Sequence, residues 1–373
     1  MSIDGAGRHP AAWRAATEPI DWFGADYPVR LAQEAERGCF DFVVFEDAFG
    51  RPPLGAGQRG GRLDALLVAA RVAPVTRSIG LIPVVTTTHT EPFHVSKNIA
   101  TLDFVSLGRA GWKLAVSTTE EDAARFGRKR AAPLAELYAE ASEAADIVAR
   151  LWDSWEDDAV IRDVATGRYL DRDKVHYVDF EGRFFRVRGP SITPRSPQAQ
   201  PPVAVDVTSD EALAVAAERA NLAFLLTADV DDARRQRERI REAVAAAGRA
   251  PDDVAVLATV DVLLAGDEAA ARDARSRLDA LAAPVTVTAD TLEVVGTPAS
   301  LAAVLEDWFR SGAVDGFVLR PAVLPGGLSP LVDEVVPRLQ DRGLFRRSYG
   351  ASTLRGHFGW ERPANRYAEA STS

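Results

Sequence analysis

Cysteine is almost absent from this chain of 373 residues, and Cys39 is its only cysteine. A single thiol cannot form an intramolecular disulfide, and it excludes the Cys-rich zinc and iron–sulfur sites. Cys39 itself is best explained as a small buried hydrophobe. Histidine is scarce as well, with five copies dispersed along the chain at positions 9, 89, 94, 176 and 357. Because no cluster has the spacing of metal ligands, we expect no metal site.

Long apolar runs are also missing. No window approaches the roughly 18 consecutive apolar residues of a membrane span, and the first 30 residues carry acidic side chains instead of the apolar core of a signal peptide. We therefore expect a cytoplasmic protein with no membrane partner. Positive charge is in deficit too, since 44 Lys and Arg face 54 Asp and Glu, a net charge of −10. Non-specific binding to nucleic acid needs a basic surface, so we expect no nucleic-acid partner.

Short apolar runs are plentiful, and they alternate with longer amphipathic ones. With 47% hydrophobic residues the chain can bury a sizeable core. Strands separated by helices are predicted at 40–45, 79–85, 111–116, 203–207, 222–226, 254–264 and 316–319. Such apolar strands are typical of a parallel sheet that helices cover on both faces. Eight strands would close a (β/α)₈ barrel, whereas an open doubly wound sheet has about five or six. The sequence therefore favours an α/β fold of the TIM-barrel type.

Two segments interrupt the repeat of strand and helix. Residues 152–200 are polar and contain a hairpin signal at Gly182, and an insertion near the barrel mouth explains them better than a separate domain. Residues 325–373 hold one predicted helix and then polar sequence, which we expect to wrap the outside as a C-terminal tail. We therefore predict a single barrel domain over residues 1–373.

Hydroxyl-bearing residues follow several of the predicted strands, where a barrel places its functional groups. Thr208 and Ser209 come directly before a predicted helix. Their hydroxyls and the free amides of the helix could bind a phosphate, or they could form an ordinary helix cap, and the residues alone leave both open. The chain has no nucleophile elbow, Walker loop, HExxH motif or strand-linked GxGxxG motif. Several hydrolase, nucleotide-binding and Rossmann functions are thereby excluded.

Longer motifs resemble one enzyme family. Glu91-Pro92-Phe93-His94, Ala100-Thr101-Leu102-Asp103 and Gly108-Arg109-Ala110-Gly111-Trp112 are similar to a motif series of the bacterial luciferase-like flavin monooxygenases. The subgroup is that of nitrilotriacetate monooxygenase, pristinamycin IIA synthase and dibenzothiophene-sulfone monooxygenase. Motifs at 151–159, 184–190, 315–319, 324–328 and 342–345 agree with it, so the resemblance covers the chain from residue 9 to about 354.

This resemblance implies a two-component monooxygenase on a (β/α)₈ barrel. Such enzymes take reduced FMN from a separate NAD(P)H:flavin reductase and use O₂, through a C4a-peroxyflavin, to oxidise a small organic substrate. The cofactor carries the chemistry, and the protein positions it and excludes water. The resemblance also implies a homo-oligomer, but it assigns no catalytic residue. The flavin contacts that it implies are Asp47, Thr86, Thr87, Thr88, Lys113, Ser117, Tyr138, Thr208 and Ser209.

The chain departs from the family pattern in five places, one of which is Leu134, where the family has a His before the helix tyrosine. Lys113 replaces an Asn, and the phosphate loop at 206–212 reads DVTSDEA, without glycine and with added carboxylates that Lys113 or Arg128 would offset. The chain begins MSID where the family has an apolar run, so we expect the first strand to be absent or atypical. The segment between 281 and 294, which covers the active site in the family, is short. Two alternatives stay open, namely a flavin-dependent dehydrogenation or imine-forming oxidation in secondary metabolism, and a flavin-free accessory or binding homologue.

Overall fold

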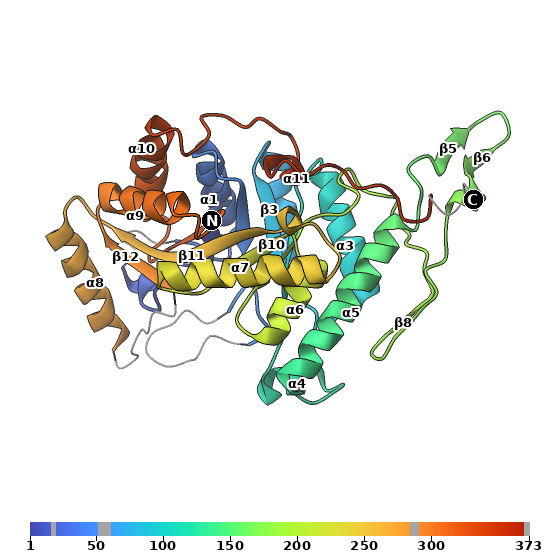
Figure 1. Ribbon diagram of the computed structural model, residues 1–373, viewed down its shortest axis with the longest axis horizontal. Coiled ribbons are helices and arrows are strands. Elements are labelled where there is room, and N and C mark those ends of the chain that lie inside the picture. Colours follow the sequence, from blue (N-terminus) through green and yellow to red (C-terminus); the bar gives the residue numbers. More distant parts are fainter. Residues whose placement is uncertain (16–19, 51–60, 284–290, 369–373) are drawn as a thin grey trace.

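The computed structural model describes residues 1–15, 20–50, 61–283 and 291–368, and a ring of parallel strands runs through its centre (Figure 1). The ring is closed where Arg8 N and His9 N, just after the first strand, donate to Pro321 O and Ala322 O at 2.9 and 3.0 Å. The predicted (β/α)₈ barrel is thereby confirmed. In ring order its strands are β1 (Ser2–Ile3), β2 (Phe42–Phe45), β3 (Gly80–Thr86), β4 (Trp112–Ala115), β9 (Val203–Asp206), β10 (Leu222–Leu225), β11 (Ala255–Leu264) and β13 (Gly316–Pro321).

The first strand is present, which corrects the expectation that it is absent. Ser2 and Ile3 pair in parallel with Val44 and Phe45, and the amino group of Met1 donates to Phe42 O at 2.9 Å. The strand is only two residues long and begins with a serine. The strand is atypical in that respect. So short a segment has no apolar run, and for that reason the sequence pattern could not reveal it.

The central sheet has a ninth described strand, β12 (Leu292–Gly296), which was not predicted. Positions 255–258 of the long strand β11 pair with β10, and positions 260–264 pair with β12. β13 pairs with 257–262, so β10 and β12 share one edge of β11 and β13 occupies the other. β12 therefore extends the barrel wall beyond β10 toward the C-terminal ends of the strands, which form the mouth.

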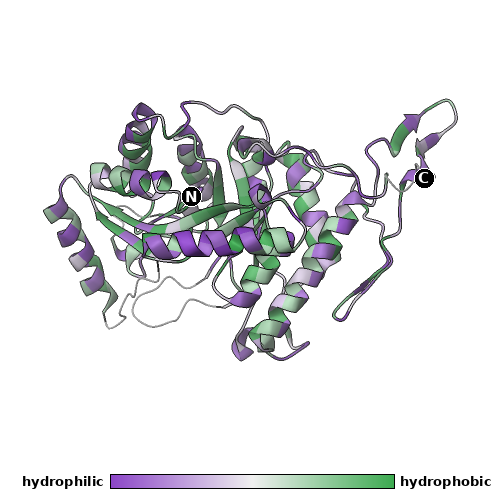
Figure 2. Ribbon diagram, viewed as in Figure 1, coloured by the Kyte–Doolittle hydropathy of each residue, from purple (hydrophilic) through white to green (hydrophobic). Residues whose placement is uncertain are grey.

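Helices surround the ring, and their outward faces are hydrophilic, most clearly on α7 (Figure 2). No helix in the described part of the chain is both long and apolar enough to cross a bilayer. The helices are α1 (Asp26–Arg37), α2 (Ala65–Val72), α3 (Pro92–Val105), α4 (Glu120–Phe126), α5 (Leu134–Asp153), α6 (Asp210–Arg219), α7 (Val230–Ala246), α8 (Glu268–Ala282), α9 (Pro298–Arg310), α10 (Val336–Asp341) and α11 (Leu354–His357).

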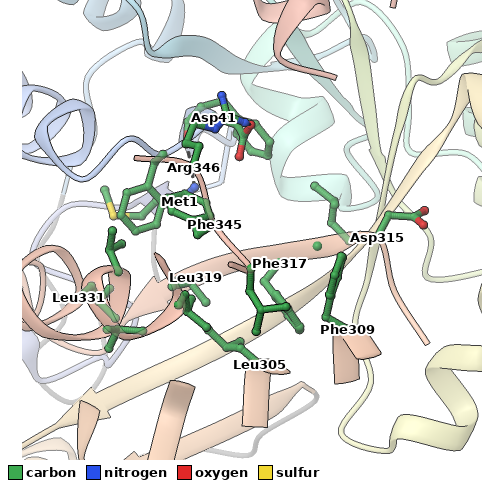
Figure 3. Close-up of a pocket in the computed structure, with 18 of the residues that line it drawn as sticks. Met1, Asp41, Leu305, Phe309, Asp315, Phe317, Leu319, Leu331, Phe345 and Arg346 are labelled. Carbon is green, nitrogen blue, oxygen red and sulfur yellow. Dashed lines mark hydrogen bonds and ion pairs between the residues drawn. The ribbon is translucent and has the colours of Figure 1, made fainter. Parts of the chain in front are cut away.

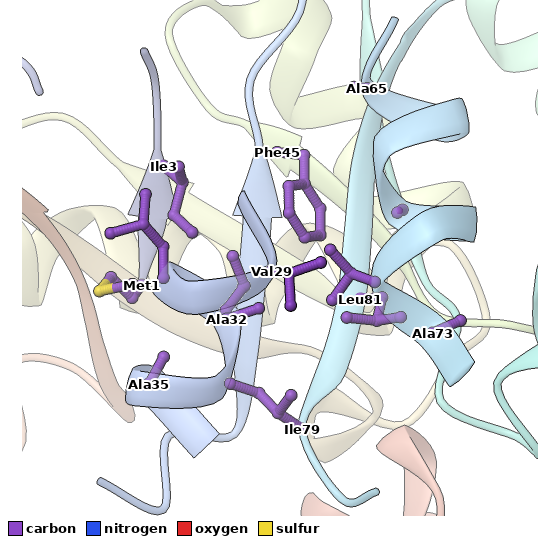
Figure 4. Packing of buried hydrophobic residues seen from close by; sticks show 14 of the residues in the cluster. Met1, Ile3, Val29, Ala32, Ala35, Phe45, Ala65, Ala73, Ile79 and Leu81 are labelled. Atoms are coloured by element: carbon purple, nitrogen blue, oxygen red, sulfur yellow. The ribbon is translucent and has the colours of Figure 1, made fainter. Parts of the chain in front are cut away.

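Alternation along each strand divides the core into two layers. In β2, Val43 and Phe45 face outward and pack with α1 and α2 (Figure 4), whereas Phe42 and Val44 face the interior of the ring. Inside, the rings of Phe42 and Phe224 stack with centroids 6.0 Å apart. The same alternation turns Trp112 and Leu114 of β4 toward the helices. It therefore turns the residue between them, Lys113, into the barrel.

The insertion joins α5 to β9 and forms two antiparallel hairpins, β5 (Val160–Asp163) with β6 (Arg168–Leu170) and β7 (Phe180–Glu181) with β8 (Arg186–Val187). The hairpin predicted at Gly182 is the second of these. Since α5 runs away from the mouth, both ends of the insertion lie at the opposite face, which differs from the position expected near the mouth. Only the hairpin β7–β8 returns along α5, where Arg183 N donates to Glu143 at 2.9 Å.

The C-terminal segment packs against the face opposite the mouth. Leu354 is fully buried among the interior residues, beside two glycines whose missing side chains leave space for it. A Cβ atom at Gly80 would lie 2.5 Å from Leu354, and one at Gly111 would lie 2.9 Å from it. Further on, Asn365 donates to the carbonyl of Asp153 at 2.8 Å and thereby ties this segment to the base of the insertion.

Arg109 explains why part of the family-like motif is structural. Its side chain is buried and donates to the carbonyls of Ser106 at 2.7 Å, Ile79 at 2.8 Å and Ala73 at 2.7 Å. Ala73 and Ser106 follow the last residues of α2 and α3, where helix geometry leaves carbonyl acceptors unpaired, and Ile79 directly precedes β3. Arg109 therefore fixes the position of β3, whose other end carries the predicted threonines.

We expect Arg109→Ala to lower the free energy of unfolding by about 2–4 kcal/mol, because several buried carbonyls lose their donors. Urea unfolding followed by circular dichroism measures it. The matched control Arg71→Ala removes an exposed guanidinium from α2 and should change stability by less than about 0.5 kcal/mol. Equal effects of the two substitutions would contradict the assignment.

Candidate active site at the barrel mouth

Two cavities lie at opposite ends of the barrel. One of about 280 Å³, here called the mouth cavity, lies at the C-terminal ends of the strands and is lined by Ser2, Glu46, Lys113, Asp206, Thr259 and Arg320, among others. The other, of about 610 Å³, lies near the starts of β2 and β13 and is lined largely by apolar side chains, among them Phe317 and Leu319 of β13 and Phe345 of the C-terminal segment (Figure 3). Barrel enzymes carry their active sites at the C-terminal ends of the strands, so the mouth cavity is the candidate site.

Lys113 forms the centre of the floor of the mouth cavity. Its ammonium lies 3.1 Å from Glu46 Oε2 and 3.1 Å from Asp206 Oδ2, and its side chain is only 8% exposed. Ser2 Oγ donates to Glu46 Oε1 at 2.8 Å. Burial lowers the pKa of Lys113, but the two carboxylates raise it more, so that the pKa lies above its usual value. Burial raises the pKa of Glu46, and Lys113 and Ser2 reverse this to a net lowering. All of this favours the charged forms at neutral pH.

The threonines after β3 connect the ends of two neighbouring strands. Thr87 Oγ1 donates to Ala115 O at 3.2 Å, and Thr88 Oγ1 accepts from Ser117 N at 3.1 Å. Ser117 Oγ in turn donates to Asp122 Oδ2 at 3.0 Å. Thr86, Thr87, Thr88 and Ser117 are all buried. The result is a compact polar wall at the mouth ends of β3 and β4.

A second set of hydroxyls lies after the end of β9 and on α5, and consists of Thr208, Ser209 and Tyr138. Tyr138, on α5, is hydrogen-bonded to Thr208, and burial raises its pKa, which keeps the phenol neutral. Ser209 Oγ accepts from Ala212 N at 3.2 Å and so caps α6. The helix cap that the sequence left open is therefore real. The first two amides of α6 lie next to this cap, close to the hydroxyls of Tyr138, Thr208 and Ser209. Hydroxyls and helix amides together are an arrangement that binds phosphates.

All but one of the carboxylates that the sequence adds near this point have a cationic partner among the described residues. Asp206 is paired with Lys113, as the sequence suggested, and Asp210 accepts from Arg239 at 2.8 Å. Arg128, the other candidate cation, lies 3.5 Å from Glu91 instead. Pairing reduces the repulsion that Asp206 and Asp210 would exert on a bound phosphate.

Asp47 connects β2 to α2. It accepts from Ala48 N at 2.8 Å and Ala65 N at 2.9 Å, and burial raises its pKa despite these bonds. With it, the nine residues named from the sequence can be placed. They follow or belong to β2, β3, β4 and β9, which are consecutive neighbours in the ring, and Tyr138 joins them from α5. The structure thus brings them to one arc of the mouth, in two hydrogen-bonded groups and the Lys113 floor.

His89 is a further residue of this arc, and the sequence did not assign it a role. It has a left-handed φ of 70°, and its ring stacks on Phe126 with centroids 4.7 Å apart. Its Nδ1 is buried and has no hydrogen-bond partner among the described residues. Burial lowers its pKa, which favours a neutral imidazole. The only signal in the sequence was its position directly after β3.

Known proteins are similar to this chain over its full length. The family model "Luciferase-like monooxygenase" matches residues 6–310. N-acetyl-S-(2-succino)cysteine monooxygenase of Bacillus subtilis is 32% identical, over 98% of this chain and 97% of its own length. Nitrilotriacetate monooxygenase component A of Aminobacter aminovorans is 30% identical over 98% and 97%. The alignment with the former spans 428 positions, so the relative has at least 55 residues for which this chain has no counterpart.

Among solved structures, that of riboflavin lyase, determined with a modified FMN and riboflavin, is 26% identical. It superimposes with a TM-score of 0.89 over 98% of this chain and 96% of its own. The subgroup that the sequence motifs indicated is confirmed, and with it the class of activity, an oxygen-using monooxygenase that depends on a flavin. The chain belongs to the luciferase-like monooxygenase family.

Proposed function

We propose that this protein is the oxygenating component of a two-component system, in which a separate NAD(P)H:flavin reductase supplies reduced FMN. With O₂, the protein then oxidises a small organic substrate in the mouth cavity. The observation that carries the proposal is the arc of hydroxyls on β3, β4 and β9. Its support is the name of the relative called component A and the FMN-derived ligand of the related lyase structure.

The donor set of the arc fits FMN. Tyr138, Thr208 and Ser209 with the first amides of α6 would hold the phosphate, since hydroxyls and helix amides donate to anions. Thr86, Thr87 and Thr88 would lie beside the ring system. Reduced FMN supplies the electrons and activates O₂ when it is bound. The chain contributes position, a polar wall and a floor that is already hydrogen-bonded before any ligand enters.

A flavin-free role fits this geometry less well. The hydroxyls of Tyr138, Thr208 and Ser209 stay together beside the first amides of α6. Asp206 and Asp210 each have a cationic partner, at 3.1 and 2.8 Å, which reduces their repulsion of a bound phosphate. The added carboxylates therefore do not exclude flavin binding at this position.

Ser209→Asp should weaken the binding of reduced FMN by at least about tenfold, because it adds a negative charge where the phosphate is expected. Anaerobic titration followed by flavin fluorescence measures the affinity. The binding of reduced riboflavin, which has no phosphate, should be weakened much less by the same substitution. The control Ser209→Asn keeps a capping side chain without the charge and should retain binding. Wild-type protein that fails to bind reduced FMN at about 100 μM would contradict the proposed function.

Lys113→Met should destabilise the protein by about 2–3 kcal/mol at pH 7, because Glu46 and Asp206 lose their shared cation while Glu46 stays buried. In the wild type the lowered pKa of Glu46 gives stability that is present above its usual pKa and is lost as the pH falls through the lowered value. In the variant the carboxylates repel each other, so protonation relieves strain.

Between pH 7 and pH 5 the contribution of Glu46 to the stability of the wild type stays constant, whereas protonation of a carboxylate should stabilise the variant. The difference in melting temperature between wild type and Lys113→Met should narrow between pH 7 and pH 5, which scanning calorimetry measures. The matched control Lys97→Met removes a cation from the outer helix α3 and should show a small difference that does not vary with pH. If the difference in melting temperature between wild type and Lys113→Met did not change with pH, the loss of the ion pairs of Lys113 would not be the cause of the lower stability.

A further inference from the structure

The larger of the two cavities, here called the base cavity, lies at the end of the barrel away from the mouth. It is outside the strand wall, because its lining residues Phe317 and Leu319 face outward from β13, whereas Val318 between them packs inside the ring. Leu305 of α9 and Leu339 of α10 line it from the helix layer. A sheet and its covering helices normally pack without voids larger than a water molecule. A space of about 610 Å³ between them therefore indicates room for a ligand.

Aromatic rings are numerous in the wall of the base cavity. Six phenylalanines of the described part of the chain line it, namely Phe40, Phe42, Phe309, Phe317, Phe345 and Phe358. Phe40 and Phe317 are only partly buried, and Phe309 is 44% exposed. These rings thus keep apolar surface that an occupant would cover, and aromatic rings pack favourably edge-to-face or offset against one another. The lining favours an aromatic occupant.

The carboxylates that line the cavity leave no charge for an ionic ligand. Each of them has a guanidinium partner: Asp41 binds Arg346, Asp315 accepts from Arg237 at 2.7 Å, and Glu306 accepts from Arg310 at 2.8 Å. Figure 3 shows Asp41 and Arg346 on one side of the cavity and Leu305 and Phe309 on the other. Burial of an ionised ligand without a partner is costly. An uncharged occupant therefore fits this lining.

His357, which also lines the cavity, has a polar atom without a partner. Its Nε2 lies 2.8 Å from Ser78 O, and since a carbonyl oxygen only accepts, this nitrogen carries the proton. Burial lowers the pKa of His357, so the ring is neutral and its Nδ1 is an acceptor. Nδ1 is buried and has no hydrogen-bond partner among the described residues. A buried acceptor without a donor is costly, and a hydroxyl group on the occupant would supply the donor.

A small molecule fits the base cavity better than another protein chain does. Among the described lining side chains that are large and apolar, only Phe309 is substantially exposed, and the others are buried or half-buried. A partner chain would reach little of this lining, whereas stable protein interfaces cover about 800 Å² on each partner. The volume lies within the range of about 300–1,000 Å³ that is typical of small-molecule pockets. Phe309 marks the place where the cavity meets solvent.

We propose that the base cavity is a second small-molecule site, which binds an uncharged aromatic compound with a hydroxyl group, such as a phenol or a naphthol. The phenylalanine rings pack around the aromatic part, and His357 Nδ1 accepts from the hydroxyl. The site lies at the opposite end of the barrel from the hydroxyl arc. It therefore stands whether or not the mouth binds a flavin.

The test compares three naphthalene derivatives, 2-naphthol, 2-methoxynaphthalene and 2-naphthoate, which differ in donor and charge. Equilibrium dialysis against the full-length protein at pH 7 measures their binding, without flavin and with reduced FMN under anaerobic conditions. We expect 2-naphthol to bind with Kd below about 1 mM and the other two at least about tenfold more weakly. Reduced FMN should leave the affinity for 2-naphthol unchanged.

Two substitutions separate the contacts. Phe309→Ala should weaken the binding of 2-naphthol about 3- to 10-fold, because an aromatic contact is lost. The matched control Phe104→Ala removes a similarly exposed ring from α3 and should have no effect. His357→Phe should weaken 2-naphthol about tenfold and leave 2-methoxynaphthalene unchanged, whereas a general disturbance of the fold would weaken both. Melting curves establish that each variant is folded.

Four outcomes would overturn the proposal. The first is a Kd of 2-naphthol above about 1 mM, and the second is equal binding of 2-naphthol and 2-methoxynaphthalene to the wild type. The third is competition between 2-naphthol and reduced FMN, which would place the compound at the mouth. The fourth is a change of oligomeric state in Phe309→Ala, measured by light scattering, which would make the entrance an interface between copies of this chain.

Discussion

The ion pairs of one buried ammonium determine what the barrel mouth can accept. Lys113 faces inward because side chains alternate along β4, and its ammonium contacts Asp206 of the neighbouring strand β9 and Glu46, which follows β2. A lysine so buried would lose its charge without these partners, and the carboxylates would repel each other without the lysine. The three residues therefore exist as a unit. They link β2 to the adjacent strands β4 and β9, past the intervening strand β3, and they keep the centre of the mouth polar.

The barrel could be predicted from the sequence because its strands are apolar on both faces and therefore form recognisable runs. Ser2–Ile3 and Leu292–Gly296 escaped prediction for physical reasons. The former is too short for any pattern, and the latter alternates weakly and acquires its partner only because β11 extends past β10. The position of the insertion follows from the direction of α5, the helix that precedes it. A segment that follows an outer helix starts at the face away from the mouth, whatever its composition.

The candidate site could be predicted only in part. Resemblance named residues that the structure gathers on consecutive strands, but it could not show that Lys113 is engaged in ion pairs or that Asp210 is neutralised by Arg239 from the next helix. Such pairs join residues far apart in the sequence. His89 was likewise unassigned, because a histidine in a loop has no sequence pattern. Part of the family motif is structural, since Arg109 binds backbone carbonyls far from the mouth.

The central proposal is that the hydroxyl arc holds a reduced flavin by its phosphate. A crystal structure of the protein with FMN, reduced in the crystal, tests it most directly. We expect the phosphate within hydrogen-bond distance of the Tyr138 and Ser209 hydroxyls and the α6 amides. A phosphate bound at another point of the barrel would contradict the proposal.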